Sequence, residues 1–434
     1  MKIVLITPGT GSYYCGVCMR DNALAKELVR QGHDAVMLPM YLPLTLDETA
    51  ASPETPVFYG GINVYLQQKS GVFARLPRWI STALNHPALL RLAGKRSGMT
   101  SGAELGALTV SMMSGEEGRQ AAELERLVEW LKSEGRADAI WLSTLLLVGL
   151  ARRIKTELRL PVIASLQGED GFLDSLPAPW RERAWRLMAE RARDLDRIIA
   201  PSRFYAEFMA GRLGTAAQAI RTIPNGISLD GFADGVEPPR SATIGFLARF
   251  IEEKGLGIVV DAFIELKRRN NFPDAKLRCA GAMTSDDARY VAALRNKLAA
   301  AGVAEDAEFL PNVTRDEKIA FLHSVNLLSV PTQYPEAFGL FLLEAMAAAR
   351  PVVQPRAAAF TEIVERTGAG ILVPPNDVGA LVDGWEALLA DSRRARELGR
   401  NGRTAVERDF TIARMTEAYL AATREFIDGA APAQ

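Results

Sequence analysis

The sequence contains little cysteine, little histidine and almost no net charge. Its 434 residues include three cysteines, three histidines, 51 basic and 52 acidic residues. Three unevenly placed cysteines do not form a disulfide framework, and a net charge of −1 gives no reason to expect nucleic acid as a partner. The hydrophobic content of 48% and the charged content of 24% are typical of globular domains, not of disordered chains.

Long apolar runs are also missing. The sequence has no run of about 20 apolar residues, so it predicts no membrane-spanning helix. The apolar stretch after Met1 and Lys2 is too short for the hydrophobic region of a signal peptide, and it continues into a predicted strand. We therefore expect a cytoplasmic protein. At 434 residues the chain is too long for one ordinary domain, and two domains are expected.

Acidic residues are absent from positions 55–103, where every charged residue is basic. Apolar residues, among them Trp79, are interleaved with these charges. Such a segment can lie on an anionic membrane surface or grip an anionic acceptor, or it can be an insertion that packs on the first domain. Peripheral contact with the inner face of the membrane through residues 69–96 is therefore one of three alternatives. The basic residues of this segment are Lys69, Arg75, Arg78, Arg91, Lys95 and Arg96.

The order of predicted elements indicates parallel sheets. Residues 2–7 form a predicted buried strand, residues 21–31 a helix and residues 35–39 a second strand. A strand, a helix and a strand in this order are typical of a parallel, doubly wound sheet. The same pattern restarts at residue 243, so we predict the α/β class for both domains.

A linker is predicted where the pattern is interrupted. A run rich in proline and glycine extends to Pro239. The predicted domains are therefore residues 1–232, with an insertion at about 40–120, and residues 240–411.

The most informative stretch, residues 335–347, contains two glutamates. Glu336 and Glu344 are separated by about 12 Å if the residues between them are helical. The two carboxyls of a glycosidase lie about 5–9.5 Å apart, so this spacing is better suited to the two ends of one long ligand. Between the glutamates, backbone N–H groups at a predicted helix start favour an anion. These groups belong to Ala337, Phe338, Gly339 and Leu340.

Two interpretations of this stretch compete. In the simpler one, Glu336 is a solvated residue and Glu344 lies on an ordinary amphipathic helix. However, Glu344 has apolar neighbours on both sides, and a carboxylate in such surroundings must find a partner. We favour the second interpretation, a site for a sugar, a diphosphate and a ribose.

Glu336 and Glu344 reproduce the E-x7-E signature of retaining, nucleotide-sugar-dependent glycosyltransferases with the GT-B fold. The chain resembles the large family 4, which includes sucrose-phosphate synthases and bacterial lipid mannosyltransferases. The resemblance covers almost the whole chain and is strongest from about Ile198 to Pro375. It implies two Rossmann-like, doubly wound domains that face each other across a cleft. The first domain would bind the acceptor, and the C-terminal helix, residues 412–434, would pack against it. The second domain would bind the nucleotide sugar.

The resemblance also implies roles for individual residues. Glu336 would bind the hydroxyls of the donor sugar, and Glu344 those of the ribose. In the motif that begins at Thr243, Arg249 and Lys254 match the family's arginine and lysine, which bind the diphosphate. Preorganised cations stabilise the charge that develops on a leaving nucleoside diphosphate. Two cations and a helix N-terminus can replace Mg²⁺, so we expect neither metal nor cofactor.

Further donor contacts are implied at three places. Gly16 matches the glycine-rich loop that lies over the donor phosphates, and Asn312 and Val313 stand where the family contacts the nucleobase. Gln167 stands where many members have a histidine near the reacting centre. Glutamine cannot titrate, but its amide can hydrogen-bond a sugar hydroxyl.

The chain departs from the family pattern in other residues too. Ala358 and Ala359 replace a pair of glycines, which makes close backbone approach less certain there. Near Gln167, Glu169 and Asp170 could contribute to the site or could simply be favourable charges at a helix start.

Cys15 and Cys18 form a C-x-x-C pattern that the family does not require. They could pack or contact the substrate, carry out redox chemistry, or form half of a zinc site whose other ligands are missing. A nicotinamide-binding fingerprint would have glycine at Tyr14, so that interpretation fails.

The sequence therefore predicts a retaining, metal-independent hexosyltransferase with a nucleoside-diphosphate sugar as donor. Its acceptor, a glycan, a lipid or a small molecule, is not identified. The alternatives are a sugar-nucleotide epimerase of the same fold, a non-catalytic sugar-nucleotide-binding protein and, last, a redox protein built on the two cysteines.

Overall fold

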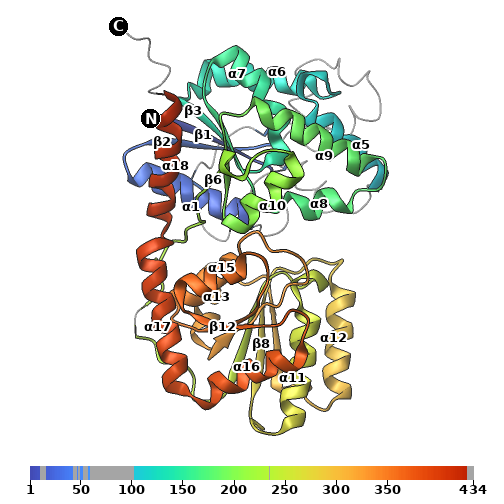
Figure 1. Ribbon diagram of the computed structural model, residues 1–434, viewed down its shortest axis with the longest axis vertical. Helices are drawn as coiled ribbons and strands as arrows, with labels where there is room; N and C mark the ends of the chain where they lie inside the picture. The colour runs from blue at the N-terminus through green and yellow to red at the C-terminus, as the bar shows by residue number, and fades with distance from the viewer. Residues whose placement is uncertain are drawn as a thin grey trace. The chain divides into compact units, whose positions relative to one another are not determined.

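The computed structural model describes residues 1–9, 16–42, 46, 49–51, 57–58, 102–233 and 235–427. The chain forms two compact units (Figure 1). Unit 1 comprises Met1–Pro224 and Ile412–Gln434, and unit 2 comprises Asn225–Thr411. Cys15 and the basic segment 69–96 lie outside the described residues, so their predicted roles stay predictions. Within the described part of the chain, no helix is long and apolar enough to cross a membrane.

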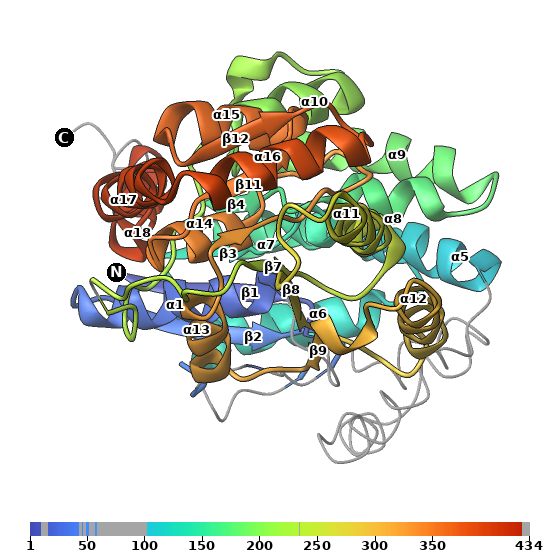
Figure 2. The ribbon, with the colours of Figure 1, turned by 90° about the horizontal axis from the view of Figure 1, so that it is seen from below.

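Unit 1 contains a six-stranded parallel sheet in the order β2-β1-β3-β4-β5-β6. The strand order reverses at β1, which pairs with both β2 and β3, and helices cover both faces of the sheet (Figure 2). The strands are β1 (Lys2–Thr7), β2 (Asp34–Pro39), β3 (Ala139–Leu142), β4 (Val162–Ser165), β5 (Arg197–Ala200) and β6 (Ile220–Thr222). The helices are α1 (Gly16–Arg30), α5 (Gly102–Met113), η3 (Gly115–Glu117), α6 (Ala121–Trp130), η4 (Leu131–Gly135), η5 (Leu145–Leu150), α7 (Ala151–Leu158), α8 (Glu169–Ser175), α9 (Trp180–Arg191), η6 (Ala192–Asp194), α10 (Arg203–Leu213), η7 (Ala217–Ala219) and α18 (Ile412–Ile427).

The C-terminal helix α18 is part of the core of unit 1. Its residues Tyr419 and Leu420 are buried with side chains of α1 and of the central strands. The Trp141 Nε1–H of β3 donates a hydrogen bond of 3.0 Å to Thr423 Oγ1. The last helix therefore completes the domain that the first residues of the chain begin.

Unit 2 contains a second six-stranded parallel sheet, in the order β12-β11-β10-β7-β8-β9. The strands are β7 (Thr243–Leu247), β8 (Lys276–Gly281), β9 (Ala307–Pro311), β10 (Leu327–Leu328), β11 (Val352–Pro355) and β12 (Gly370–Val373). The helices are η8 (Glu252–Lys254), α11 (Leu256–Arg269), α12 (Ala288–Ala300), η9 (Ala304–Asp306), α13 (Arg315–His323), α14 (Leu340–Ala347), α15 (Ala358–Thr367), α16 (Val378–Ala390) and α17 (Ser392–Asp409). These two sheets confirm the predicted α/β fold of two Rossmann-like, doubly wound domains.

Strand β10 is shorter than the buried apolar run around it suggests. Two residues after the strand, a side chain takes the place of a backbone carbonyl as hydrogen-bond acceptor. The Val330 N–H donates to the Gln354 Oε1 of β11 at 3.3 Å, not to a strand carbonyl. Gln354 is fully buried. The chain therefore leaves the sheet at this point, and it continues into the loop that carries Glu336.

Candidate functional site

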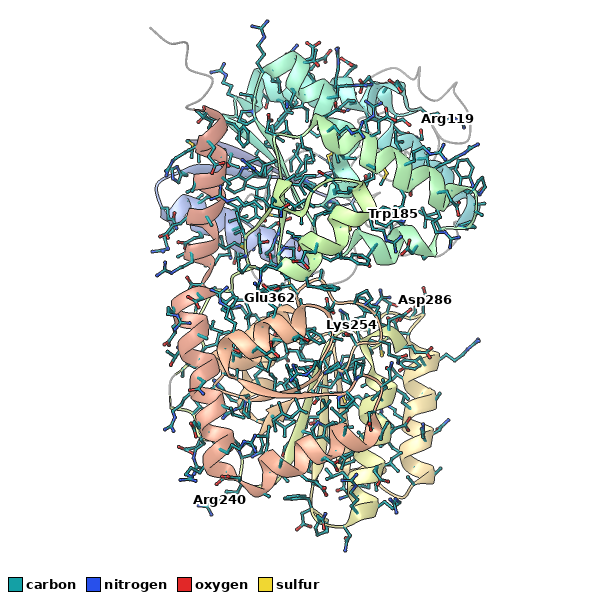
Figure 3. All side chains as sticks on the ribbon, viewed as in Figure 1. Arg119, Trp185, Arg240, Lys254, Asp286 and Glu362 are labelled. Carbon is teal, nitrogen blue, oxygen red and sulfur yellow. The ribbon has the colours of Figure 1, made fainter. Side chains whose placement is uncertain are left out.

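All the residues that the sequence assigns to unit 2 follow the carboxyl ends of its strands or lie on the helix after β10. Arg249 and Lys254 follow β7, Asn312 follows β9, and Glu336 follows β10. In open α/β sheets this edge is where ligands bind. Lys254 lies at this end of unit 2, whereas Arg240 lies at the opposite end (Figure 3).

Lys254 and Glu336, predicted to hold neighbouring parts of the donor, form an ion pair. The Lys254 Nζ lies 2.6 Å from Glu336 Oε2. The Tyr334 hydroxyl lies 3.0 Å from the same oxygen, and it also contacts Lys254 Nζ. The ammonium lies over the Tyr334 ring, 4.9 Å from its centroid, and over the Phe341 ring at 5.8 Å. Tyr334 was not found from the sequence, because nothing in the motif indicates this contact.

The backbone after Lys254 must approach the β10 loop closely. Gly255 has φ +77°, and a Cβ atom there would lie 1.9 Å from the Pro331 carbonyl oxygen. Only glycine tolerates both conditions without a shift of the loop. Gly255 therefore allows η8 to hold Lys254 beside Glu336.

Glu344 has the partner that its apolar neighbours require. The Lys318 Nζ of α13 lies 2.7 Å from Glu344 Oε1, and the two side chains are 12% and 18% exposed. The sequence predicted that a partner is needed but did not identify it, because α13 and α14 meet only in the folded domain.

The start of α14 lies four residues after Glu336. Gly339 precedes the helix with φ +92° and, as a glycine, has no side chain that could cap the first turn. A Cβ atom at Gly339 would lie 2.9 Å from Phe360 Cε1. Ala337 and Phe338 are buried, and Leu340 is the first residue of the helix. This end of α14 has the geometry of an anion site.

Arg249 is oriented by a buried carboxylate. Its Nη2 lies 3.3 Å from Asp287 Oδ1, and the Arg249 side chain remains 40% exposed. The other Asp287 oxygen accepts hydrogen bonds from the Thr284 N–H at 2.8 Å and the Thr284 hydroxyl at 2.7 Å. Asp287 was not found from the sequence. It holds the guanidinium toward the loop that follows β8.

The Asn312 side chain is engaged within the protein. Its Oδ1 accepts from the Met283 N–H, and its Nδ2 donates to the Met283 carbonyl, both at 3.0 Å. Asn312 also adopts φ +58°. Because the amide fixes the loop after β8, a nucleobase contact at Asn312 and Val313 would have to use backbone atoms.

The alanines that replace the family's glycines keep a left-handed turn. Ala358 has φ +49°, which is unusual for a residue with a side chain. The following N–H, of Ala359, lies 3.4 Å from the Glu336 carbonyl oxygen. The turn therefore supports the Glu336 loop.

In unit 1, the predicted residues Gly16 and Gln167 follow β1 and β4 at the carboxyl edge of the sheet. Gly16 is exposed, and Gln167 is half-buried. The adjacent Tyr205 hydroxyl has a pKa raised far above its usual range, by burial first and then by Glu169 and Asp170.

The two described cysteines are buried. The Cys18 sulfur lies 3.7 Å from Thr7 Oγ1, and burial raises the pKa of Cys279 well above its usual range. Among the described residues, no three His, Cys, Asp or Glu side chains are grouped as metal ligands would be.

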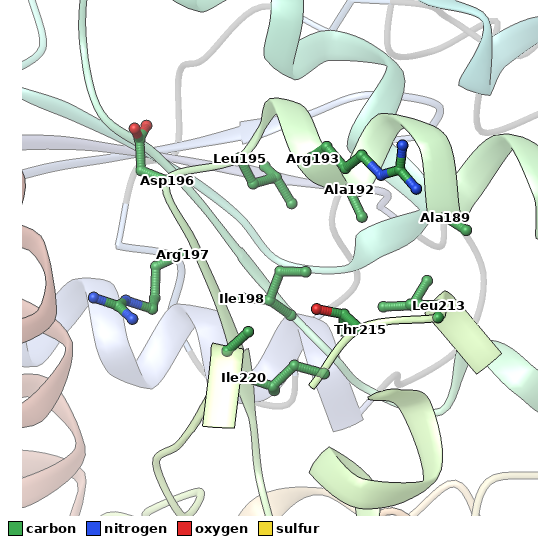
Figure 4. A pocket seen from close by; sticks show the side chains of 12 residues that line it. Ala189, Ala192, Arg193, Leu195, Asp196, Arg197, Ile198, Leu213, Thr215 and Ile220 are labelled. Atoms are coloured by element: carbon green, nitrogen blue, oxygen red, sulfur yellow. The ribbon is translucent and has the colours of Figure 1, made fainter. Parts of the chain in front are cut away.

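A separate pocket of about 240 Å³ in unit 1 contains none of the predicted residues (Figure 4). It lies at the amino end of β5 and is lined mainly by apolar side chains. Asp196, which borders it, binds Lys155 at 2.9 Å and the Val162 N–H at 2.8 Å. This pocket is distinct from the carboxyl edges that carry the candidate residues.

Two family models match the chain, one in each unit. Residues 232–405 match glycosyl transferases group 1, and residues 102–230 match Glycosyltransferase Family 4.

Two curated relatives are mannosyltransferases. The phosphatidyl-myo-inositol mannosyltransferase of Mycobacterium tuberculosis is 33% identical over 195 residues, 43% of this chain and 49% of the relative. The GDP-mannose-dependent alpha-(1-6)-phosphatidylinositol monomannoside mannosyltransferase of Mycolicibacterium smegmatis is 27% identical over 305 residues, 65% of this chain and 74% of the relative. The match to the first relative thus spans about half of its length.

Solved structures match both units. Sucrose-phosphate synthase from Thermosynechococcus elongatus matches with a TM-score of 0.72 at 18% identity, over 99% of this chain and 100% of that chain. Anabaena HepE in complex with UDP matches with a TM-score of 0.68 at 16% identity, over 98% of this chain and 100% of that chain. At such identities the likeness shows the fold alone.

Proposed function

Because the chain carries glycosyltransferase domains of group 1 and family 4 on a GT-B fold, we propose that it is a retaining, metal-independent hexosyltransferase. Its donor is a nucleoside-diphosphate sugar, and its acceptor is a glycan, a lipid or a small molecule. The names of the relatives make GDP-mannose a donor to test first, and the UDP complex of HepE adds UDP-sugars.

One observation carries this proposal: the carboxyl edge of unit 2 combines two cations, two carboxylates and a helix start. Lys254 contacts Glu336 directly, and Glu336 lies four residues before the first residue of α14. Glu344 lies farther along the same helix. This order supports binding of the sugar at Glu336, the diphosphate at Arg249, Lys254 and the α14 start, and the ribose at Glu344.

The proposed chemistry needs charge stabilisation more than a nucleophile. As the glycosidic bond breaks, the leaving diphosphate gains negative charge, which Lys254 and Arg249 stabilise from preset positions. Lys254 is then shared between the phosphate and Glu336, while Glu336 orients the sugar hydroxyls. The acceptor hydroxyl attacks from the face that the diphosphate leaves, and it gives its proton to a departing phosphate oxygen. This front-face route retains the anomeric configuration.

The test is donor turnover with GDP-mannose, UDP-glucose and ADP-glucose in EDTA. We expect release of nucleoside diphosphate from one donor and a retained anomeric configuration, which NMR of the sugar product measures. The same release with Arg249→Ala and Lys254→Met variants, or an inverted product, would contradict the proposal.

A non-catalytic sugar-nucleotide-binding protein is the second candidate, because Gln167 and Ala358 depart from the family pattern. Such a protein binds the donor but releases no nucleotide with any acceptor. A sugar-nucleotide epimerase would instead convert the donor into its epimer, which NMR of the recovered donor detects.

A further inference from the structure

A buried carboxylate joins the ends of β3 and β4 in unit 1. Glu169 is the first residue of α8 and is 2% exposed. Its Oε1 accepts hydrogen bonds from the Thr144 hydroxyl at 2.7 Å and the Leu145 N–H at 3.0 Å. Both donors lie at the turn from β3 into η5. One carboxylate oxygen therefore fixes the turn after β3.

The other oxygen binds the loop that carries Gln167. Oε2 accepts from the Gln167 N–H at 2.9 Å and from the Gly168 N–H at 3.1 Å. The Tyr205 hydroxyl lies 3.2 Å from Glu169 Oε2, and it also binds Asp170 Oδ1 at 2.6 Å. Gly168 has φ +105°, so the chain turns sharply at this point. The carboxylate therefore determines where the Gln167 backbone lies.

The hydrogen bonds to Glu169 come from uncharged groups. Of the described residues, no lysine, arginine or histidine forms an ion pair with Glu169, and its partners are all neutral N–H and O–H groups. Burial of a charge without a counterion is costly. An acceptor with several lone pairs is needed where so many donors converge, and the two oxygens of a carboxyl group supply them.

We propose that Glu169 is a positioning residue that fixes the backbone of Gln167, the residue predicted to contact the donor sugar. This inference rests on the proposed function and on the prediction that Gln167 hydrogen-bonds a hydroxyl of the donor sugar. A misplacement of about 1 Å can cost about a hundredfold in rate, so a carboxylate that fixes the Gln167 backbone affects turnover without touching the substrate. The free nucleoside diphosphate, which is proposed to bind unit 2, lacks the sugar and should bind with unchanged affinity.

The first test is a double-mutant cycle with Glu169→Gln and Gln167→Ala. The rate of nucleoside diphosphate release from the donor is measured, together with the Kd for the free nucleoside diphosphate. We expect each single variant to lose about tenfold in kcat with an unchanged Kd, and the double variant to lose no more than Gln167→Ala alone. Independent losses that multiply in the double variant would overturn the inference.

Asp174→Asn is the matched control, since it makes the same change on the same helix. The Asp174 carboxylate binds Trp185 Nε1 at 2.8 Å and Arg212, not the Gln167 loop. We expect kcat to be unchanged in this variant. A loss equal to that of Glu169→Gln would mean that any damage to α8 has the same effect.

A second measurement does not depend on turnover. Hydrogen exchange of the amides of Gln167 and Gly168 should become at least tenfold faster in Glu169→Gln. If that variant does not fold, Thr144→Val replaces it, and a smaller increase is expected there. Unchanged exchange would overturn the inference. A wild-type protein that releases no nucleotide while these amides respond would instead contradict the proposed function alone.

Discussion

At the scale of single residues, the hydroxyl of Tyr334 links the two groups that are proposed to handle the sugar and the diphosphate. It lies 3.0 Å from Glu336 Oε2 and contacts Lys254 Nζ, while its ring lies under the ammonium. A lysine with four rotatable bonds is thereby restricted to one position. Donor binding then requires little rearrangement of Lys254.

We predict that Tyr334→Phe lowers kcat/KM for the donor about tenfold. The ring stays over Lys254, but a hydrogen bond to charged groups, worth about 1.5–3 kcal/mol, is lost. Steady-state nucleotide release measures this change. Tyr290→Phe is the control, because that hydroxyl accepts from the Gly257 N–H at 3.0 Å and not from Lys254, and it should leave kcat/KM unchanged. Equal rates for Tyr334→Phe and wild type would contradict the role of the hydroxyl.

Ala358 gives a prediction about stability. At φ +49° its side chain costs about 1–2 kcal/mol, which glycine avoids. Ala358→Gly should therefore raise the Tm of unit 2 by a few degrees. Ala348→Gly, at φ −82°, should lower it. Calorimetry compares the two, and equal losses in both variants would show that the turn at Ala358 is not strained.

At the scale of elements, the loops after β8 and β9 stabilise each other and orient Arg249. Asn312 binds the backbone of Met283, and Asp287 binds Thr284 and Arg249. The start of α12 is thus coupled to the proposed diphosphate site.

We predict that Asp287→Ala weakens nucleoside diphosphate binding about tenfold and destabilises unit 2 by about 1–3 kcal/mol. The half-buried donors of Thr284 lose their acceptor, and Arg249 loses the carboxylate that orients it. Titration calorimetry and thermal unfolding measure the two effects. Asp306→Ala, which removes a carboxylate bound to Lys267 and Lys276, should leave binding unchanged. An unaffected Kd in Asp287→Ala would mean that Arg249 does not need this support.

The sequence predicted secondary-structure elements better than it predicted contacts between side chains. The apolar runs at residues 2–7 and 35–39 predicted β1 and β2 closely, because the pattern of apolar residues is a local property of the sequence. The end of β10 was not predictable, since it depends on the Gln354 side chain from a neighbouring strand. The Lys318–Glu344 pair and the contacts of Glu169 with Thr144, Leu145 and Tyr205 were missed for the same reason: residues distant in sequence form them.

At the scale of the whole molecule, the two units carry different parts of the proposed reaction. Unit 2 contains the cations and carboxylates assigned to the donor, and unit 1 contains Gly16 and Gln167. The last helix, α18, returns to unit 1 and is buried in its core. The division of roles follows from the family motifs and stays a prediction. The acceptor was not predictable, because residues 40–120 resemble the family least.

The most direct test of the donor site is the thermal stability of the protein with UDP, GDP and ADP in the absence of metal. At 100 times its Kd, a nucleotide should stabilise the folded state by about 2.7 kcal/mol. We predict that one base gives a clear rise in Tm, and that Arg249→Ala and Glu344→Ala abolish it. If no nucleotide changes the Tm at millimolar concentration, the carboxyl edge of unit 2 is not a nucleotide-sugar site.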